Sequence, residues 1–187
     1  MHRKGHLAFC FMNGRVLQIN VSPRGGIPKR RIEHGYVTRL GLEGDAVAHP
    51  NFHGAPNQAV LMITQGAIDE LNAMGYEIFS GALGENFTVA GLDRLAVRLG
   101  ERYRIGECTA EISKLRQPCD QLNVYNREDL PRIQKQVFDA KVKAGDFSSP
   151  RWGLAGFYAR IVEEGIVREG DEVELLQPQL STETANF

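Results

Sequence analysis

Hydrophobic residues along the chain fall in short runs, and most of these runs alternate with polar residues as β-strands do. The clearest alternation covers residues 107–113, whose apolar side holds Cys108, Ala110 and Ile112. Similar patterns or short apolar runs predict strands over Leu7–Met12, Arg15–Val21, Ala59–Ile63, Asn86–Val89, Arg102–Ile105, Phe157–Val162 and Glu172–Leu176. The pair Asn13-Gly14 is typical of a type I′ turn and predicts a hairpin between the first two of these. Many short strands and few helices favour a mainly β fold, a closed or nearly closed barrel.

Two segments have the period of an amphipathic helix. The first is expected to begin after Thr64, which can cap it, and to end at Gly75. The second is expected over about 129–144, with Pro131 in its first turn and Gly145 after its end. Their apolar stripes are Ile68, Leu71 and Met74 in the first, and Leu130, Ile133, Val137 and Phe138 in the second.

Composition narrows the class of protein. The chain has 187 residues, 42% of them hydrophobic and 24% charged, with a net charge of −1. These values predict one globular domain over 1–177, and the aperiodic residues 178–187 are expected to form a flexible tail. The near-neutral net charge provides no excess of positive charge for binding nucleic acid. No apolar run approaches the roughly 18–20 residues of a membrane span. Since no secretory signal is present either, we expect a cytoplasmic protein that binds neither nucleic acid nor membrane.

Three cysteines make an odd count, so disulfides alone do not use them all. Cys10 and Cys108 lie in predicted strands and are expected to pack as small apolar residues. Both are therefore interpreted as structural.

Cys119 stands apart, because it follows a predicted strand and Pro118, which places it on an irregular corner of the chain. Lys114 and Arg116 stabilise a thiolate, the form that attacks electrophiles and binds metals, whereas Asp120 opposes it. On these residues alone, a functional thiol and an ordinary loop cysteine both remain open.

Other candidate motifs carry less weight. His49 and His53 are four residues apart, but Pro50 and Gly54 argue against the helix on which such a pair would share a metal. Asp45 is interpreted as a turn residue whose carboxylate caps backbone donors, with a catalytic role beside His53 as the alternative. The chain has no GxSxG elbow, phosphate loop or dinucleotide fingerprint. Residues 150–153 fit either a lid over a pocket or a surface loop.

A series of short motifs, in order over about residues 25–176, resembles the MOSC domain, named for the C-terminal domain of molybdenum cofactor sulfurases. Each motif is weak alone, and their order carries the resemblance. They are Gly25-Gly26-Ile27-Pro28-Lys29, Gly41-Leu42-Glu43-Gly44-Asp45, His53-Gly54, Gln58-Ala59-Val60, Gly84-Glu85-Asn86-Phe87-Thr88, Gly91-Leu92, Gly100 to Gly106, Arg116-Gln117-Pro118-Cys119, Tyr158 to Gly165, and Gly170-Asp171.

The resemblance, which is to the stand-alone bacterial members, implies a β-barrel similar to that of pyruvate kinase. It implies that Cys119 is the functional cysteine, either as a thiolate ligand to the molybdenum of a bound molybdenum cofactor or as a persulfide that carries sulfur. In the first role, relatives reduce N-hydroxylated substrates. His53, Gln58, Asn86 and Arg116 are then expected to hold cofactor or substrate oxygens.

Two departures from the family pattern are visible. Ala55 stands where the family usually has a second glycine after His53, and Glu101 replaces a common aspartate. No redox domain is recognised, so a reductase needs a separate electron-transfer partner, and a sulfur carrier needs a cysteine desulfurase. A non-catalytic module that binds or delivers the cofactor is the third alternative.

Overall fold

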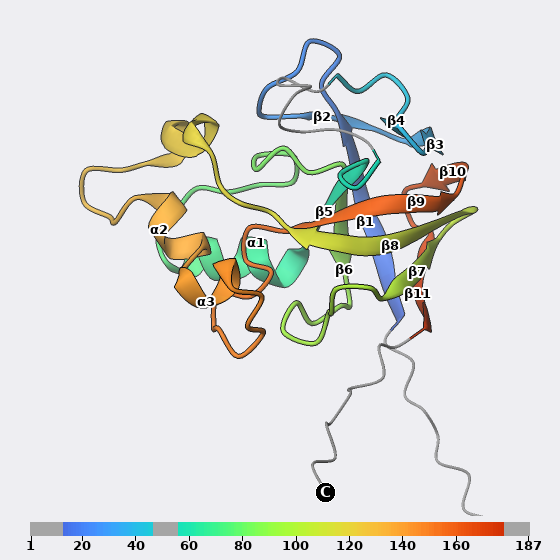
Figure 1. Cartoon of the computed structure of the whole chain (residues 1–187). Helices are drawn as coiled ribbons and strands as arrows, with labels where there is room; N and C mark the ends of the chain where they lie inside the picture. The colour runs from blue at the N-terminus through green and yellow to red at the C-terminus, as the bar shows by residue number, and fades with distance from the viewer. Residues whose placement is uncertain (1–12, 47–55, 178–187) are drawn as a thin grey trace, which may run out of the picture.

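Seven strands of the computed structural model, which describes residues 13–46 and 56–177, close into a β-barrel (Figure 1). Their order is β1, β11, β7, β8, β9, β5, β6 and back to β1. All these pairings are antiparallel except the parallel β5–β6 pair. The strands are β1 (Asn13–Val21), β5 (Val60–Thr64), β6 (Phe87–Ala90), β7 (Arg102–Ile105), β8 (Cys108–Leu115), β9 (Phe157–Glu163) and β11 (Glu172–Gln177). The mainly β barrel expected from the sequence is confirmed.

Four short strands add to the barrel and were not predicted. β2 (Arg30–Ile32) pairs with the end of β1, while β10 (Gly165–Arg168), β3 (His34–Thr38) and β4 (Gly41–Leu42) form a separate small sheet. β2 has no buried residue and β4 has only two residues, so neither carries an alternation that could be recognised.

The turn predicted at Asn13-Gly14 is wrong. Both residues belong to β1, where they pair with Glu174 and Val173 of β11. A Cβ on Gly14 would lie 2.8 Å from the carbonyl oxygen of Ala90, so the glycine permits a close approach of two strands rather than a reversal of the chain. The predicted partner strand Leu7–Met12, with Cys10, lies outside the described residues, as does the expected tail at 178–187.

The first predicted helix is confirmed as α1 (Gln65–Ala73). The Thr64 hydroxyl accepts a hydrogen bond of 3.3 Å from the backbone N–H of Ala67, and Gly75 follows the helix with a φ of 97°. Ile68 and Leu71 are buried as expected, whereas Met74 is 38% exposed at the C-cap.

The second predicted helix is broken in two. α2 (Ile133–Val137) and α3 (Ala140–Lys143) are separated at Phe138, whose backbone is extended with φ −151° and ψ 137°. The side chain of Asp139 accepts from the backbone N–H of Val142 and so starts a new helix. A local N-cap therefore overrides a continuous apolar stripe.

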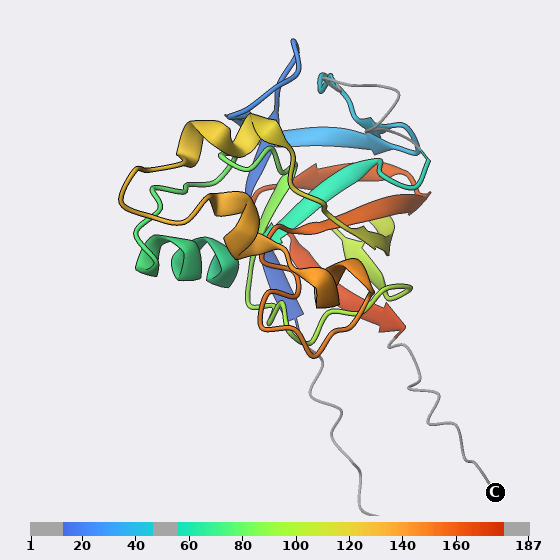
Figure 2. The ribbon, with the colours of Figure 1, turned by 60° about the vertical axis from the view of Figure 1, so that its left-hand side comes forward.

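The helices and the 3-10 helix η1 (Asp120–Tyr125) lie together on one side of the barrel (Figure 2). A second apolar cluster fills the space between them and the barrel, and includes Ile63, Leu71, Leu122 and Ile133. This packing fixes η1, and hence Cys119 at its start, against the rest of the fold.

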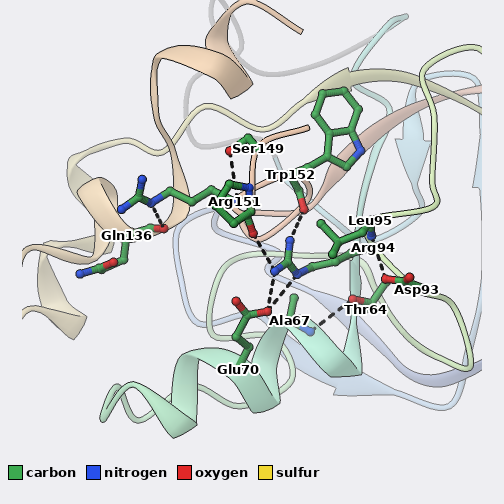
Figure 3. A network of polar contacts seen from close by, with 11 residues as sticks. Thr64, Ala67, Glu70, Asp93, Arg94, Leu95, Gln136, Ser149, Arg151 and Trp152 are labelled. Atoms are coloured by element: carbon green, nitrogen blue, oxygen red, sulfur yellow. Dashed lines mark hydrogen bonds and ion pairs between the residues drawn. The ribbon is translucent and has the colours of Figure 1, made fainter. Parts of the chain in front are cut away.

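A buried arginine ties this helical layer to the loop before β9 (Figure 3). The Arg94 guanidinium bonds the Glu70 carboxylate of α1 at 2.5 Å and the carbonyl oxygens of Pro150 and Trp152. Trp152 is 1% exposed, and its indole N–H donates to the carbonyl of Val97. Trp152 is therefore part of the core, and the interpretation of residues 150–153 as a lid over the pocket is wrong.

Candidate functional site

One open pocket brings together four of the residues singled out in the sequence, Gln58, Asn86, Arg116 and Cys119. It lies where β6, β5, β9 and β8, neighbours in the barrel, meet the loops before β5 and β6 and after β8. The cavity volume is about 90 Å³, within roughly 600 Å³ of space that includes open solvent.

Cys119 reaches this pocket from the N-cap of η1. Its backbone is extended, with φ −122° and ψ 176°, and its carbonyl accepts the first hydrogen bond of η1 from Leu122 at 3.1 Å. The thiol is free and the residue is half-buried. By contrast, Cys108 is fully buried, and burial, with a smaller contribution from Asp171, raises the pKa of its thiol to about 12. Cys108 is therefore a core residue, as predicted.

Arg116 supplies a buried positive charge beside the thiol. The residue is 5% exposed, and its Nη1 has no hydrogen-bond partner among the described residues. Burial raises the pKa of the neighbouring Tyr158 hydroxyl, an effect that the Arg116 guanidinium opposes and Cys119 reinforces. A buried guanidinium nitrogen without a partner is costly, and this one belongs to a residue that lines an open pocket.

Lys29 and Asp45 form an ion pair in the same pocket, with 2.5 Å between Nζ and Oδ2 and side chains 12% and 11% exposed. Asp45 also accepts from the backbone N–H of Ser22 at 2.7 Å and from the Asn86 amide at 2.8 Å. Its backbone-capping role is thus confirmed. The pairing with Lys29 was not anticipated from the sequence.

Asn86 lines the pocket, but most of its amide is already engaged within the protein. Its Oδ1 accepts from the backbone N–H of Leu61 at 3.0 Å, and its Nδ2 donates to the carbonyl of Asn20 as well as to Asp45. Both amide hydrogens are therefore used, and the geometry gives Asn86 the task of holding Asp45.

A buried carboxyl group lies behind the pocket. Glu85 is 0% exposed, and its Oε1 accepts from the backbone N–H of Gly81 and from the Thr88 hydroxyl. Its Oε2 has no partner among the residues described. Burial raises the pKa of Glu85, against the opposing effects of these hydrogen bonds and of the nearby Arg116 charge.

The remaining predicted residues are distributed as follows. Gln58 is half-buried in the pocket wall, and His53 and Ala55 lie outside the described residues. Lys114, expected to support the thiolate, is exposed and lines a different hollow together with Lys143. Of the two cations expected near Cys119, the structure brings only Arg116 into the pocket.

Sequence reasoning missed several members of the site. Lys29 and Glu85 were noted only as letters of family motifs, and Gln121 and Tyr158 were not considered as site residues. For Gln121 and Tyr158 the sequence offers no signal, because a residue of a 3-10 helix and one of a strand meet at the pocket only through the tertiary fold.

A closed seven-stranded barrel defines the class of fold, and its site combines a half-buried thiol at the start of a short helix with a buried arginine that has one unpartnered nitrogen. Residues 49–174 match the MOSC domain, and the chain belongs to that family. Lys29 and Asp45 precede the matched region, so the pocket extends beyond it.

Two curated bacterial proteins are similar in sequence. The uncharacterized protein YflK of Bacillus subtilis is 31% identical over 155 residues, which are 81% of this chain and 63% of that protein. Protein YiiM of Escherichia coli is 32% identical over 106 residues, 54% of this chain and 47% of that protein. The chain thus spans less than two thirds of the length of either relative.

Solved structures show the same fold. The crystal structure of YiiM from Geobacillus stearothermophilus has a TM-score of 0.61 at 25% identity, covering 88% of this chain and 75% of that one. The YUAD protein of B. subtilis has a TM-score of 0.64 at 19% identity and covers 88% and 96%.

No helix within residues 13–46 and 56–177 is long and apolar enough to cross a membrane. No three His, Cys, Asp or Glu side chains of these ranges gather closely enough to form a metal cage.

Proposed function

We propose that the pocket binds the molybdenum cofactor through Cys119 and that the protein reduces N-hydroxylated substrates, N–OH to N–H, with electrons from a separate reductase. The observation that carries the proposal is the buried Arg116 Nη1, which lacks a partner in the described structure and shares a pocket with a free thiol. Membership of the MOSC family supports it.

The residues present fit such a group in chemistry and, in part, in size. A soft thiolate suits molybdenum, and a single protein ligand suffices when a pterin dithiolene supplies others. Arg116 offers a buried hydrogen-bond donor for an anionic group of the cofactor. The pocket is about 90 Å³ in volume and open to solvent, so it would leave room for part of such a group beside these side chains.

Each residue has a defined task in this proposal. Cys119 holds the metal, and the bound cofactor supplies two-electron redox chemistry there. Arg116 and Gln58 bind cofactor or substrate oxygens, and the proposal gives the same role to His53, which is outside the described residues. Asn86 lines the wall and keeps Asp45 in place.

One alternative is a sulfur carrier that binds no pterin, which needs only a free, half-buried thiol in an open pocket. In that role Cys119 receives sulfur from a cysteine desulfurase as a persulfide, and the open side of the pocket gives the acceptor access. Arg116 would then stabilise the persulfide anion.

The test uses protein purified without oxygen from a host that makes the cofactor. Reduction of an N-hydroxylated base by the wild-type protein with a competent reductase, abolished in Cys119→Ala, supports the proposal. Cyanide-releasable sulfur on Cys119 without turnover or pterin overturns it in favour of the carrier. Bound cofactor without turnover overturns the reductase activity and leaves a binding or delivery module.

A further inference from the structure

Lys29 is the least expected charged group of the pocket. It is the last residue of the loop between β1 and β2, and its side chain is 12% exposed. Asp45 holds its ammonium group at 2.5 Å, and Asp45 is itself fixed by Ser22 and Asn86. Three separate segments thus orient one ammonium group in the pocket that Cys119 lines.

The position of Lys29 is also fixed through the backbone. Its N–H donates to the carbonyl of Gly81 at 2.9 Å. Gly81 has a φ of 92°, and a Cβ at this position would lie 2.4 Å from the Lys29 carbonyl oxygen. The loop that carries Lys29 is therefore seated against a glycine that leaves no room for a side chain.

Reduction of an N–OH group needs a proton donor for the oxygen that leaves. Among the described residues of the pocket, Arg116 carries a guanidinium, a group that does not act as a proton donor in catalysis, and burial raises the pKa of the Tyr158 hydroxyl. Asp45 accepts three hydrogen bonds and serves as an acceptor. Lys29 differs from these groups, because an ammonium both carries a proton at neutral pH and can release it.

We propose that Lys29 is a catalytic residue of this site, whose ammonium group, oriented by Asp45, protonates the departing hydroxyl oxygen of an N-hydroxylated substrate. The inference rests on the proposed function. In the balanced step, R–NH–OH takes up two electrons and two protons and gives R–NH2 and water, as the N–O bond breaks. Lys29 gives one proton to the oxygen, solvent gives the other to nitrogen, and a reduced flavin or iron–sulfur protein supplies the electrons.

The charged surroundings of Lys29 suit this task. Burial lowers the pKa of its ammonium, with Arg116 acting in the same direction, while Asp45 and Glu85 oppose the shift. A general acid works best when its pKa approaches the operating pH. Since the acid form is the active one, turnover is expected to fall as the pH rises through the pKa of Lys29.

Two substitutions separate proton donation from simple charge. Lys29→Arg keeps a cation beside Asp45 but cannot release a proton, and Lys29→Met removes both properties. General acid catalysis contributes about 10²–10⁴-fold, so both variants should lose roughly 100-fold or more in kcat, together with the alkaline fall of the pH profile. Both should retain the molybdenum and pterin content of the wild type. Lys114→Met, in an exposed residue outside the pocket, is the matched control and should leave all these properties unchanged.

A second readout needs no cofactor. In cofactor-free wild-type protein, competitive acetylation with acetic anhydride across pH should show Lys29 titrating below the ordinary lysine pKa of 10.5. Wild-type activity in Lys29→Arg, loss of molybdenum from both Lys29 variants, or an ordinary titration of Lys29 would each overturn the proposal. Absence of N–OH reduction by wild-type protein that contains the cofactor overturns the proposed function itself, and the role of Lys29 with it.

Discussion

The Asn86 amide donates a hydrogen bond of 2.8 Å to the carboxylate of Asp45, so the residue that precedes β6 holds the acid that pairs with Lys29. The same amide accepts from the backbone N–H of Leu61 in β5. A barrel strand and the pocket are thereby joined through one side chain that is 3% exposed.

Replacing this amide should destabilise the fold. Asn86→Ala leaves the Leu61 N–H and the Asn20 carbonyl without partners, and each buried unsatisfied group costs about 1–3 kcal/mol. We therefore expect the free energy of unfolding to fall by about 2–4 kcal/mol in chemical denaturation. Gln65→Ala, which removes only an exposed bond to Asp69, should change it by less than about 0.5 kcal/mol. An equal effect of the two substitutions would show that Asn86 is not an anchor.

The glycine beneath Lys29 permits a matched comparison. Gly81 and Gly170 have φ values of 92° and 88°, but only at Gly81 would a Cβ meet backbone, since nothing lies within 4 Å of that position at Gly170. Gly170→Ala should cost about 1–2 kcal/mol for its backbone conformation alone. Gly81→Ala should cost clearly more in thermal or chemical unfolding. Similar losses would contradict the close seating of the Lys29 loop.

The pH dependence of stability should reveal the buried carboxyl group of Glu85. Burial raises its folded-state pKa above the ordinary 4.5, so its stabilising contribution is present below that pH and is lost as the pH rises through the folded-state pKa. The difference in unfolding free energy between Glu85→Gln and wild type should therefore grow in favour of the variant from pH 4 to pH 8. Glu128→Gln, in an exposed residue, should show little change. A difference that is flat or reversed for Glu85→Gln would contradict the raised pKa of the buried Glu85 carboxyl group.

Thiol chemistry should distinguish the two described cysteines. Cys119 is half-buried at an open pocket, whereas Cys108 is fully buried with a pKa of about 12. At pH 8 only about one Cys108 thiol in ten thousand is ionised, and the thiolate is the reactive form. Peptide mass spectrometry after iodoacetamide treatment of the native protein should find Cys119 modified at least tenfold faster. Comparable rates would place Cys119 outside an accessible site.

The barrel could be predicted from the sequence because its strands carry their own pattern. In β8, Cys108, Ala110 and Ile112 alternate with more polar residues and are buried as expected. The sequence predictions were wrong where a local sequence signal was overridden by contacts between distant parts of the chain. Asn13-Gly14 has the composition of a turn but lies in a strand, where a glycine lets two strands approach closely.

The candidate site could be predicted only in part. Arg116 and Cys119 are close in sequence, so the strand end that carries them could be recognised directly. Lys29 and Asp45 come from separate loops, which the barrel brings together, and Asn86 holds Asp45 by a hydrogen bond. The spacing of these residues in the sequence does not predict that they meet. The family resemblance supplied Asn86 and Gln58 as candidates, and the structure shows what the Asn86 amide contacts.

The most direct test of the account is the molybdenum and pterin content of the protein after anaerobic purification from a host that makes the cofactor. Wild type, Cys119→Ala and Cys108→Ala are compared, the last as a control for loss of a cysteine outside the pocket. The account predicts near-stoichiometric molybdenum and pterin in wild type and Cys108→Ala, and neither in Cys119→Ala. Retention of both by Cys119→Ala, or their absence from the wild type, would contradict it.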